Sequence, residues 1–212
     1  MYGELPEIQT KNGQSIRAFP VHIPYPEKVA ALRLPTTDEM MDYLRKQKTQ
    51  YRYLGRGKGE SIPVPNPKLD QELFERLRVD SGSESHDFDP DECSHALNLL
   101  TQQRITSCDR KGDEFIITLR TMFGDTVHIL HPPFMKDMAE YRRGVYKPID
   151  LPNNLEERRY PPEAPCKLYD SCVVSSSGYA SGFEVPPHHK QAVVLQLVTA
   201  VSELDPSLDP NV

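Results

Sequence analysis

Hydrophobic and polar residues alternate along two stretches of the chain, which indicates β-strands with one face on a core. In the first stretch, Phe19, Val21 and Ile23 are followed by the proline-containing turn signal IPYPEK. In the second, the runs EFIITLRT and TVHIL flank MFGDT, whose Gly-Asp pair is a hairpin signal. The pattern therefore predicts a β-hairpin at the start of each half of the chain.

After each hairpin, proline precedes a segment with apolar residues at helical spacing. The segments read LPTTDEMMDYLRKQ and PPFMKDMAEYRRG, and Thr37 or Asp38 could cap the first helix. The apolar stripe of such a helix either packs on the hairpin, as most apolar stripes do, or forms a partner-binding face. The residues concerned are Met40, Tyr43 and Leu44 in the first segment and Met138, Tyr141 and Arg142 in the second.

The two segments correspond at a constant offset of 98 positions. Besides the tyrosines and methionines, this offset superimposes Pro35 on Pro133 and Glu39 on Asp137. A repeat of this length is too long for a solenoid and indicates a duplicated small domain. We therefore predict a tandem duplication with a first repeat over residues 1–110 and a second over residues 111–212, and a pseudo-twofold pairing of the halves.

Each half continues with a proline-rich stretch, expected to be a loop, and two apolar helical segments. These segments are LDQELFERLRV and DPDECSHALNLLTQQRI in the first half, and CKLYDSCVV and PPHHKQAVVLQLVTAV in the second. Asp89-Pro90 and Pro186-Pro187 are helix-start signals. The predicted fold class is α+β, with two tandem copies of a β-hairpin followed by about three helices and joined by Pro-rich loops.

The composition of the chain disfavours some kinds of binding partner and indicates the cell compartment in which the protein is expected. A formal charge of −6 disfavours binding to nucleic acid, which requires clustered Lys and Arg. The chain has no apolar run of about 18 residues and no secretory signal at its start, so we expect a cytoplasmic protein that does not bind membranes. Its four cysteines lack a C-x-x-C spacing and are expected to be free, packed thiols.

Motifs for catalysis or for a cofactor are weak. The segment GRGKGE contains glycines and a lysine, but Glu60 and then a non-helical SIPVPNP follow, unlike a phosphate-binding loop. His188 and His189 are adjacent rather than one helical turn apart, so we expect solvent-exposed imidazoles. Cys93 and His95 are poorly spaced for zinc, and VVSSSGYASG lacks a nucleophile elbow. We expect no catalytic residue, no metal and no cofactor.

The end of the first hairpin and the following helix resemble the small assembly chaperones of tailed bacteriophages and related contractile particles. The residues that carry this resemblance are Leu32, Arg33, Leu34, Pro35, Asp38 and Tyr43. It implies a non-enzymatic protein in the host-cell cytoplasm, which coats a long helical tape-measure protein during tail assembly and then leaves.

Two alternatives remain open at this stage. The chain could be a structural component of the neck or tail, lashed to its neighbours by extended Pro-rich arms at residues 60–67 and 148–165. An enzyme with an unrecognised site is the less favoured alternative. The first two hypotheses predict protein partners from the tail, and a homo-oligomer is left open.

Overall fold

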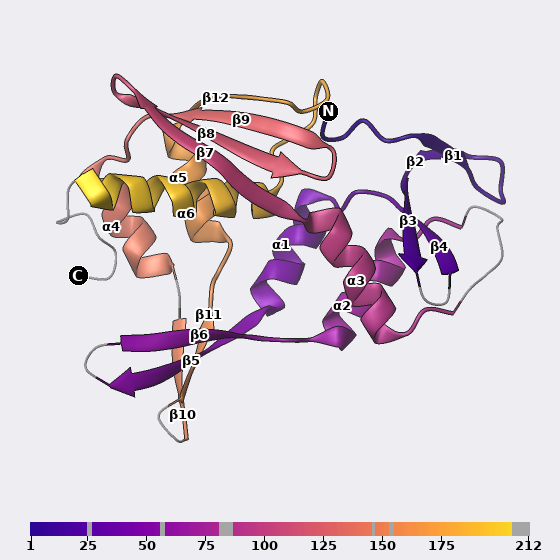
Figure 1. Cartoon of the computed structure of the whole chain (residues 1–212), viewed down its shortest axis with the longest axis horizontal. Helices are drawn as coiled ribbons and strands as arrows, with labels where there is room; N and C mark the ends of the chain where they lie inside the picture. The colour runs from indigo at the N-terminus through magenta and orange to yellow at the C-terminus, as the bar shows by residue number, and fades with distance from the viewer. Residues whose placement is uncertain (25–26, 56–57, 81–86, 146, 153–154, 205–212) are drawn as a thin grey trace.

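The computed structural model describes residues 1–24, 27–55, 58–80, 87–145, 147–152 and 155–204. Over these residues the protein is mixed α+β, with six helices and several small antiparallel sheets (Figure 1). The predicted α+β class is therefore confirmed.

The first half begins with the short pair β1 (Glu7–Gln9) and β2 (Ser15–Arg17), followed by the hairpin of β3 (Phe19–Pro24) and β4 (Glu27–Leu32). Helix α1 (Thr37–Lys46) leads into β5 (Lys48–Gly55) and β6 (Lys58–Val64). Helices α2 (Pro67–Leu77) and α3 (Pro90–Thr101) complete it. Asp89 caps α3 through a capping box, as its Asp-Pro start signal predicts.

The second half follows a similar order. Strands β7 (Gln103–Lys111), β8 (Glu114–Thr121) and β9 (Gly124–Leu130) precede α4 (Met135–Gly144). The chain continues through β10 (Lys147–Leu151), β11 (Leu155–Arg159), α5 (Glu163–Cys172), β12 (Val173–Ser177) and α6 (Pro187–Leu204). Strand β7 pairs with β8, in a sheet of order β12-β9-β8-β7. The sheet of the second half therefore starts at Gln103, before residue 111, where the second repeat was predicted to begin.

Both predicted hairpins form, but the turn of the second differs from the prediction. Thr121 pairs with Gly124, so Met122 and Phe123 occupy the turn rather than the Gly-Asp pair. The Thr121 hydroxyl donates to the Gly124 carbonyl and accepts from the Phe123 N–H, which closes the turn locally. These two hydrogen bonds of the Thr121 hydroxyl stabilise the observed turn. A turn prediction based on the Gly-Asp pair alone does not take them into account.

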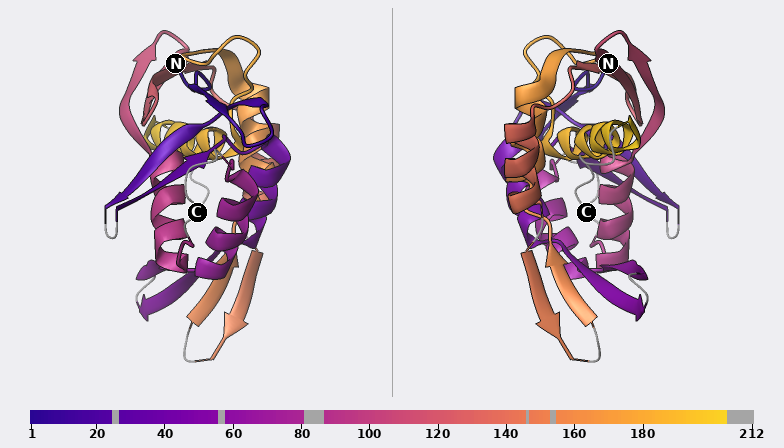
Figure 2. Two further views of the ribbon diagram at one scale, coloured as in Figure 1. Left: turned by 90° about the vertical axis from the view of Figure 1, so that its right-hand side faces the viewer. Right: turned by 90° about the vertical axis from the view of Figure 1, so that its left-hand side faces the viewer.

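Most of the described part of each proline-rich stretch is strand rather than loop, so that part of the prediction is wrong. Strands β5 and β6 form one hairpin and β10 and β11 another, and β11 pairs antiparallel with β5. The resulting sheet, β10-β11-β5-β6, lies at the end of the molecule opposite the N-terminus (Figures 1 and 2).

Proline is compatible with this sheet because it lies in the outer strands. Pro63 is in β6 and Pro148 is in β10, whereas the central strands β5 and β11 contain no proline. An edge strand tolerates a residue without an N–H donor, and such a residue also discourages pairing with another chain. The pairing of β11 with β5 joins the second strand of one hairpin to the first strand of the other, so a twofold axis does not relate them.

Each half contains a hydrophobic core of its own. The first core includes Val21, Ile23 and Phe74, from the β3–β4 hairpin and α2. The second includes Ile117 and Leu197, from β8 and α6. Each hairpin therefore buries one face against its own helices, and this burial is the main stabilising term of the fold.

Helix α1 starts with a capping box formed by Thr36, one residue before the predicted caps. The Thr36 hydroxyl accepts from the Glu39 N–H, and the Glu39 carboxylate accepts from the Thr36 N–H. Glu39 also accepts two hydrogen bonds from Arg33, which hold the pKa of the Glu39 carboxyl at about 2. This arrangement ties the end of β4 to the start of α1.

Replacing Thr36 by alanine should therefore lower the free energy of unfolding by about 1 kcal/mol, the usual contribution of an N-cap side chain. Urea denaturation followed by circular dichroism measures this change. The matched control is Thr37→Ala, because Thr37 is already inside the helix and does not cap it. Equal effects of the two substitutions would contradict the assignment of the cap.

Candidate partner-binding groove

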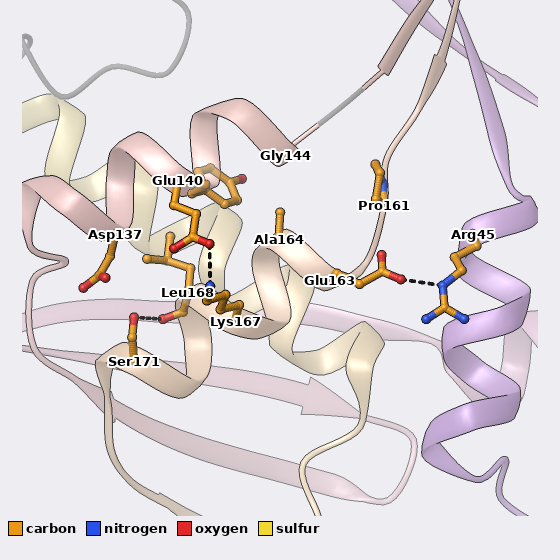
Figure 3. Close-up of a pocket in the computed structure, with 11 residues that line it drawn as sticks. Arg45, Asp137, Glu140, Gly144, Pro161, Glu163, Ala164, Lys167, Leu168 and Ser171 are labelled. Atoms are coloured by element: carbon orange, nitrogen blue, oxygen red, sulfur yellow. Dashed lines mark hydrogen bonds and ion pairs between the residues drawn. The ribbon is translucent and has the colours of Figure 1, made fainter.

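An open groove of about 610 Å³ lies between α4 and α5, with the C-terminal end of α1 at one side (Figure 3). Its lining combines apolar side chains at the base with charged side chains at the rim. The lining residues are Arg45, Asp137, Glu140, Tyr141, Gly144, Pro161, Glu163, Ala164, Lys167, Leu168 and Ser171.

The base of the groove is formed by residues that also belong to the second core. Tyr141 of α4 and Leu168 of α5 are buried in that core, and Ala164 packs against it. Gly144 and Ala164 let the two helices approach closely, since a Cβ added at Gly144 would lie 3.0 Å from the Ala164 Cβ. The groove therefore has a base held by helix packing.

Ion pairs fix the rim. Lys167 pairs with Glu140 across the two helices, and the pKa of the Glu140 carboxyl is lowered by the hydrogen bond from Lys167. Arg45 of α1 pairs with Glu163 at the start of α5 at 2.5 Å, so the first half contributes to the groove (Figure 3). Both pairs are exposed and contribute little to stability, so their main effect is on the charge that a partner meets.

The predicted partner-binding residues occupy two different environments. Met40, Met138 and Tyr141 are buried, and the two methionines are each 1% exposed. Tyr43 and Leu44 are half-buried, and the Tyr43 hydroxyl donates to Asp70 of α2 at 2.7 Å. The structure thus assigns the stripe mainly to core packing, the first of the two interpretations given above.

The groove contains only one of those six residues, Tyr141, while half-buried Arg142 lies outside its lining. The rim residues Glu140, Glu163 and Lys167 were not predicted from the sequence. They come together because α4 packs on α5, and charged residues on two separate helices give no local signal of this contact.

The adjacent histidines at the start of α6 are buried, so the prediction that they are solvent-exposed is wrong. The ring of Tyr2, from the N-terminus, lies edge-on to the ring of His189, with their centroids 4.5 Å apart. The backbone of Tyr2 is fixed by hydrogen bonds to Gly178 and Ala180. A segment distant in the sequence therefore covers these side chains, which spacing within the PPHHK motif could not reveal.

His189 belongs to a buried hydroxyl–imidazole network, and the ring of His188 packs against that of His189. The Tyr179 hydroxyl lies 2.9 Å from His189 Nδ1 and 3.2 Å from His128 Nε2, and His128 Nδ1 lies 2.8 Å from the Tyr169 hydroxyl. Burial lowers the pKa of His128 to about 4 and that of His188 to about 3, and it lowers the pKa of His189 as well. All three rings are therefore held neutral at pH 7.

The arrangement of reactive groups gives no support to a particular reaction. All four cysteines are free, and burial raises the pKa of Cys93 and Cys166 to about 11, which keeps these thiols protonated. Within the described ranges, no group of three or more histidine, cysteine, aspartate or glutamate side chains could hold a metal ion. Part of the GRGKGE segment, residues 56–57, lies outside the described residues.

Two further findings bear on the class of protein. No helix among the described residues is long and apolar enough to cross a membrane. Comparisons with protein-family models, curated protein sequences and solved structures gave no match to this chain. The functional proposal therefore rests on the geometry of the groove and on the short resemblance around Arg33 and Pro35.

Proposed function

We propose that this chain is a non-enzymatic assembly chaperone of the phage-tail type, which holds a helical segment of a tape-measure-like protein in the α4–α5 groove. The observation that carries the proposal is the groove itself, with an apolar base and a charged rim. A groove between two helices accepts the apolar face of an amphipathic helix, and rim charges set the orientation of that helix. In this proposal, the chain binds its partner in the cytoplasm of the host cell.

We also propose that the chain arose by tandem duplication of a small domain. The order hairpin, helix, hairpin, helix, helix occurs in residues 19–101 and again in residues 114–204, apart from the added strand β12. The sequence correspondence at an offset of 98 falls on α1 and α4, which occupy the same position in this order. A duplicated domain provides a related surface in each half, and the groove lies mainly on the second half.

A structural component of a neck or tail is the alternative function. This alternative requires that the segments at residues 60–67 and 148–165 extend as arms to neighbouring subunits. Where they are described, these segments include β6, β10 and β11, which pair within the chain. The arms are therefore occupied internally, and this observation favours the chaperone over the structural component.

The proposed function can be tested by capturing the tagged chain from producing cells and by mass spectrometry of soluble complexes and of finished particles. The chaperone proposal expects a long helical protein in the soluble complexes and no copy of this chain in particles. Stoichiometric presence in particles would instead support the structural component. Absence of particle proteins from both fractions would overturn both proposals.

A charge reversal on the rim tests whether the groove is the binding surface. Glu140→Lys removes the ion pair with Lys167 and places a second lysine beside it on the rim, so capture of the partner should fall at least fivefold. Asp42→Lys is the matched control, since Asp42 is also a helical carboxylate paired with a lysine but lies outside the groove lining. Equal losses in the two variants would show that the groove is not responsible.

A further inference from the structure

The start of α4 departs from the start of α1 in a way that local stability does not explain. At the offset of 98, the N-cap residue Thr36 and the first helical residue Thr37 of α1 correspond to Phe134 and Met135 of α4. Thr36 and Phe134 have nearly the same backbone angles, φ −68° and ψ 163° against φ −69° and ψ 152°. The backbone of α4 could therefore carry a threonine cap, but its N-cap residue makes no side-chain hydrogen bond.

The two residues that replace the threonines are largely exposed, although the ring of Phe134 contacts that of His131 on one side, with their centroids 5.5 Å apart. Phe134 is 69% exposed and Met135 is 66% exposed, the largest values among the large hydrophobic side chains of the described residues. This helix start lacks the stabilising hydrogen bond of an N-cap side chain. It also leaves two large apolar side chains in contact with water, which gives up the stabilisation that their burial would provide. Positions that break local rules without a compensating gain are those where a functional requirement is expected.

The same helix turn connects these residues to the groove. Asp137, which lines the groove, is the third residue after Phe134 and lies at the end of the groove opposite Arg45 (Figure 3). Of the three carboxylates in the lining, Glu140 and Glu163 pair with lysine and arginine, whereas within the described residues Asp137 has no ion pair. This end of the groove therefore combines an exposed apolar pair with one uncompensated negative charge.

We propose that Phe134, Met135 and Asp137 form the docking end of the groove and that they select a cationic amphipathic helix. The proposal rests on the proposed function for the existence of a helical partner, and it specifies the chemistry of that partner. Apolar side chains of the helix cover Phe134 and Met135, and a lysine or arginine one turn away pairs with Asp137. The chain's net charge of −6 favours the same sign of partner over longer distances.

The test uses two synthetic 18-residue helical peptides as probes, one with a leucine stripe and lysines elsewhere, the other with glutamates in place of the lysines. Fluorescence anisotropy at about 150 mM salt, where distant charges are screened, measures the binding of each peptide to the full chain. The lysine peptide should bind at least tenfold more tightly than the glutamate peptide. Equal affinities, or no binding of either peptide, would overturn the proposal.

Three variants locate the contact. Phe134→Thr with Met135→Thr introduces the residues of the first half and should weaken binding of the lysine peptide at least tenfold, while Asp137→Asn should weaken it severalfold. Leu195→Thr, which changes a leucine of α6 that is 64% exposed, should leave the affinity unchanged. If Leu195→Thr weakened binding as much as the double variant, general hydrophobic adsorption would explain the data and the proposal would fail.

The double variant also separates loss of docking from loss of folding. Because a threonine cap becomes possible at position 134, its melting temperature should stay equal or rise by roughly 2 °C while binding is lost. Unchanged capture of the helical partner from cells by the double variant would refute this inference but leave the proposed chaperone function intact. Failure of the wild-type chain to capture any such partner would refute the function instead.

Discussion

The free energy of unfolding should fall steeply when the pH is lowered from 7 to 5. The pKa values of His128, His188 and His189 are all below the ordinary value of 6.5, because burial disfavours the imidazolium form. In this range the unfolded chain takes up protons and the folded chain does not, so stability is complete above pH 6.5 and is lost as the pH falls below it. Each histidine contributes roughly 2 kcal/mol of loss by pH 5.

Three such contributions are large against a total stability of about 5–15 kcal/mol for a typical domain. The surroundings of the rings explain the size of the effect. Among the described residues, the hydrogen-bond partners of His128 and His189 are the hydroxyls of Thr126, Tyr169 and Tyr179, which carry no charge to balance an imidazolium. Neither ring nitrogen of His188 has a hydrogen-bond partner in the part of the chain that the structure describes.

Urea denaturation at half-unit pH intervals between 7 and 5 measures the effect in a window above the ordinary pKa of carboxyl groups. His188→Leu should reduce the pH dependence by about one third, since it removes one of the three neutral imidazoles. The control His22→Gln changes an exposed histidine of β3 and should leave the pH dependence unaltered. A wild-type stability that is constant over this range would contradict the buried, neutral state of the network.

The parts of the fold that were predictable from the sequence depend on local patterns. Both hairpins form where residues alternate, and α3 and α6 begin at Asp89-Pro90 and Pro186-Pro187. These signals arise from backbone geometry and from a single buried face, which neighbouring residues are enough to determine. The hairpins β5–β6 and β10–β11 were missed because proline usually argues against a strand, and their formation depends on pairing between the two halves.

The candidate site was less predictable for the same reason. Its rim joins Arg45 of α1 to Glu163 of α5, and its base lies where α4 meets α5. The stripe residues Met40 and Met138 were correctly recognised as apolar helix positions, but a helical pattern does not tell whether its apolar face meets the core or a partner. Thr36 and Phe134 have nearly the same backbone conformation, and Phe134 is exposed. Neither fact can be predicted from the sequence, which shows only that the two residues correspond.

Gly178→Ala should destabilise the protein by at least about 3 kcal/mol and lower its melting temperature by roughly 10 °C. Gly178 has a φ of +87°, and a Cβ there would lie 2.5 Å from the Asp125 carbonyl oxygen and 2.9 Å from the Thr126 Cα. Both contacts are with backbone atoms of β9, which cannot move away without disturbing its pairing with β12. The strain would also reach Tyr2, whose N–H donates to the Gly178 carbonyl at 2.8 Å and whose ring covers His189.

Gly182 provides the matched control for this prediction. Its φ of +75° is also left-handed, but a Cβ at this position would have no atom of the described residues within 4 Å. Gly182→Ala should therefore cost only the backbone term of about 1 kcal/mol, which corresponds to a few degrees in melting temperature. Differential scanning fluorimetry of the two variants compares them directly, and equal shifts would show that close contact with β9 does not determine the glycine at position 178. A larger shift for Gly178→Ala means that the close approach of β9, in addition to the left-handed backbone, requires glycine at position 178.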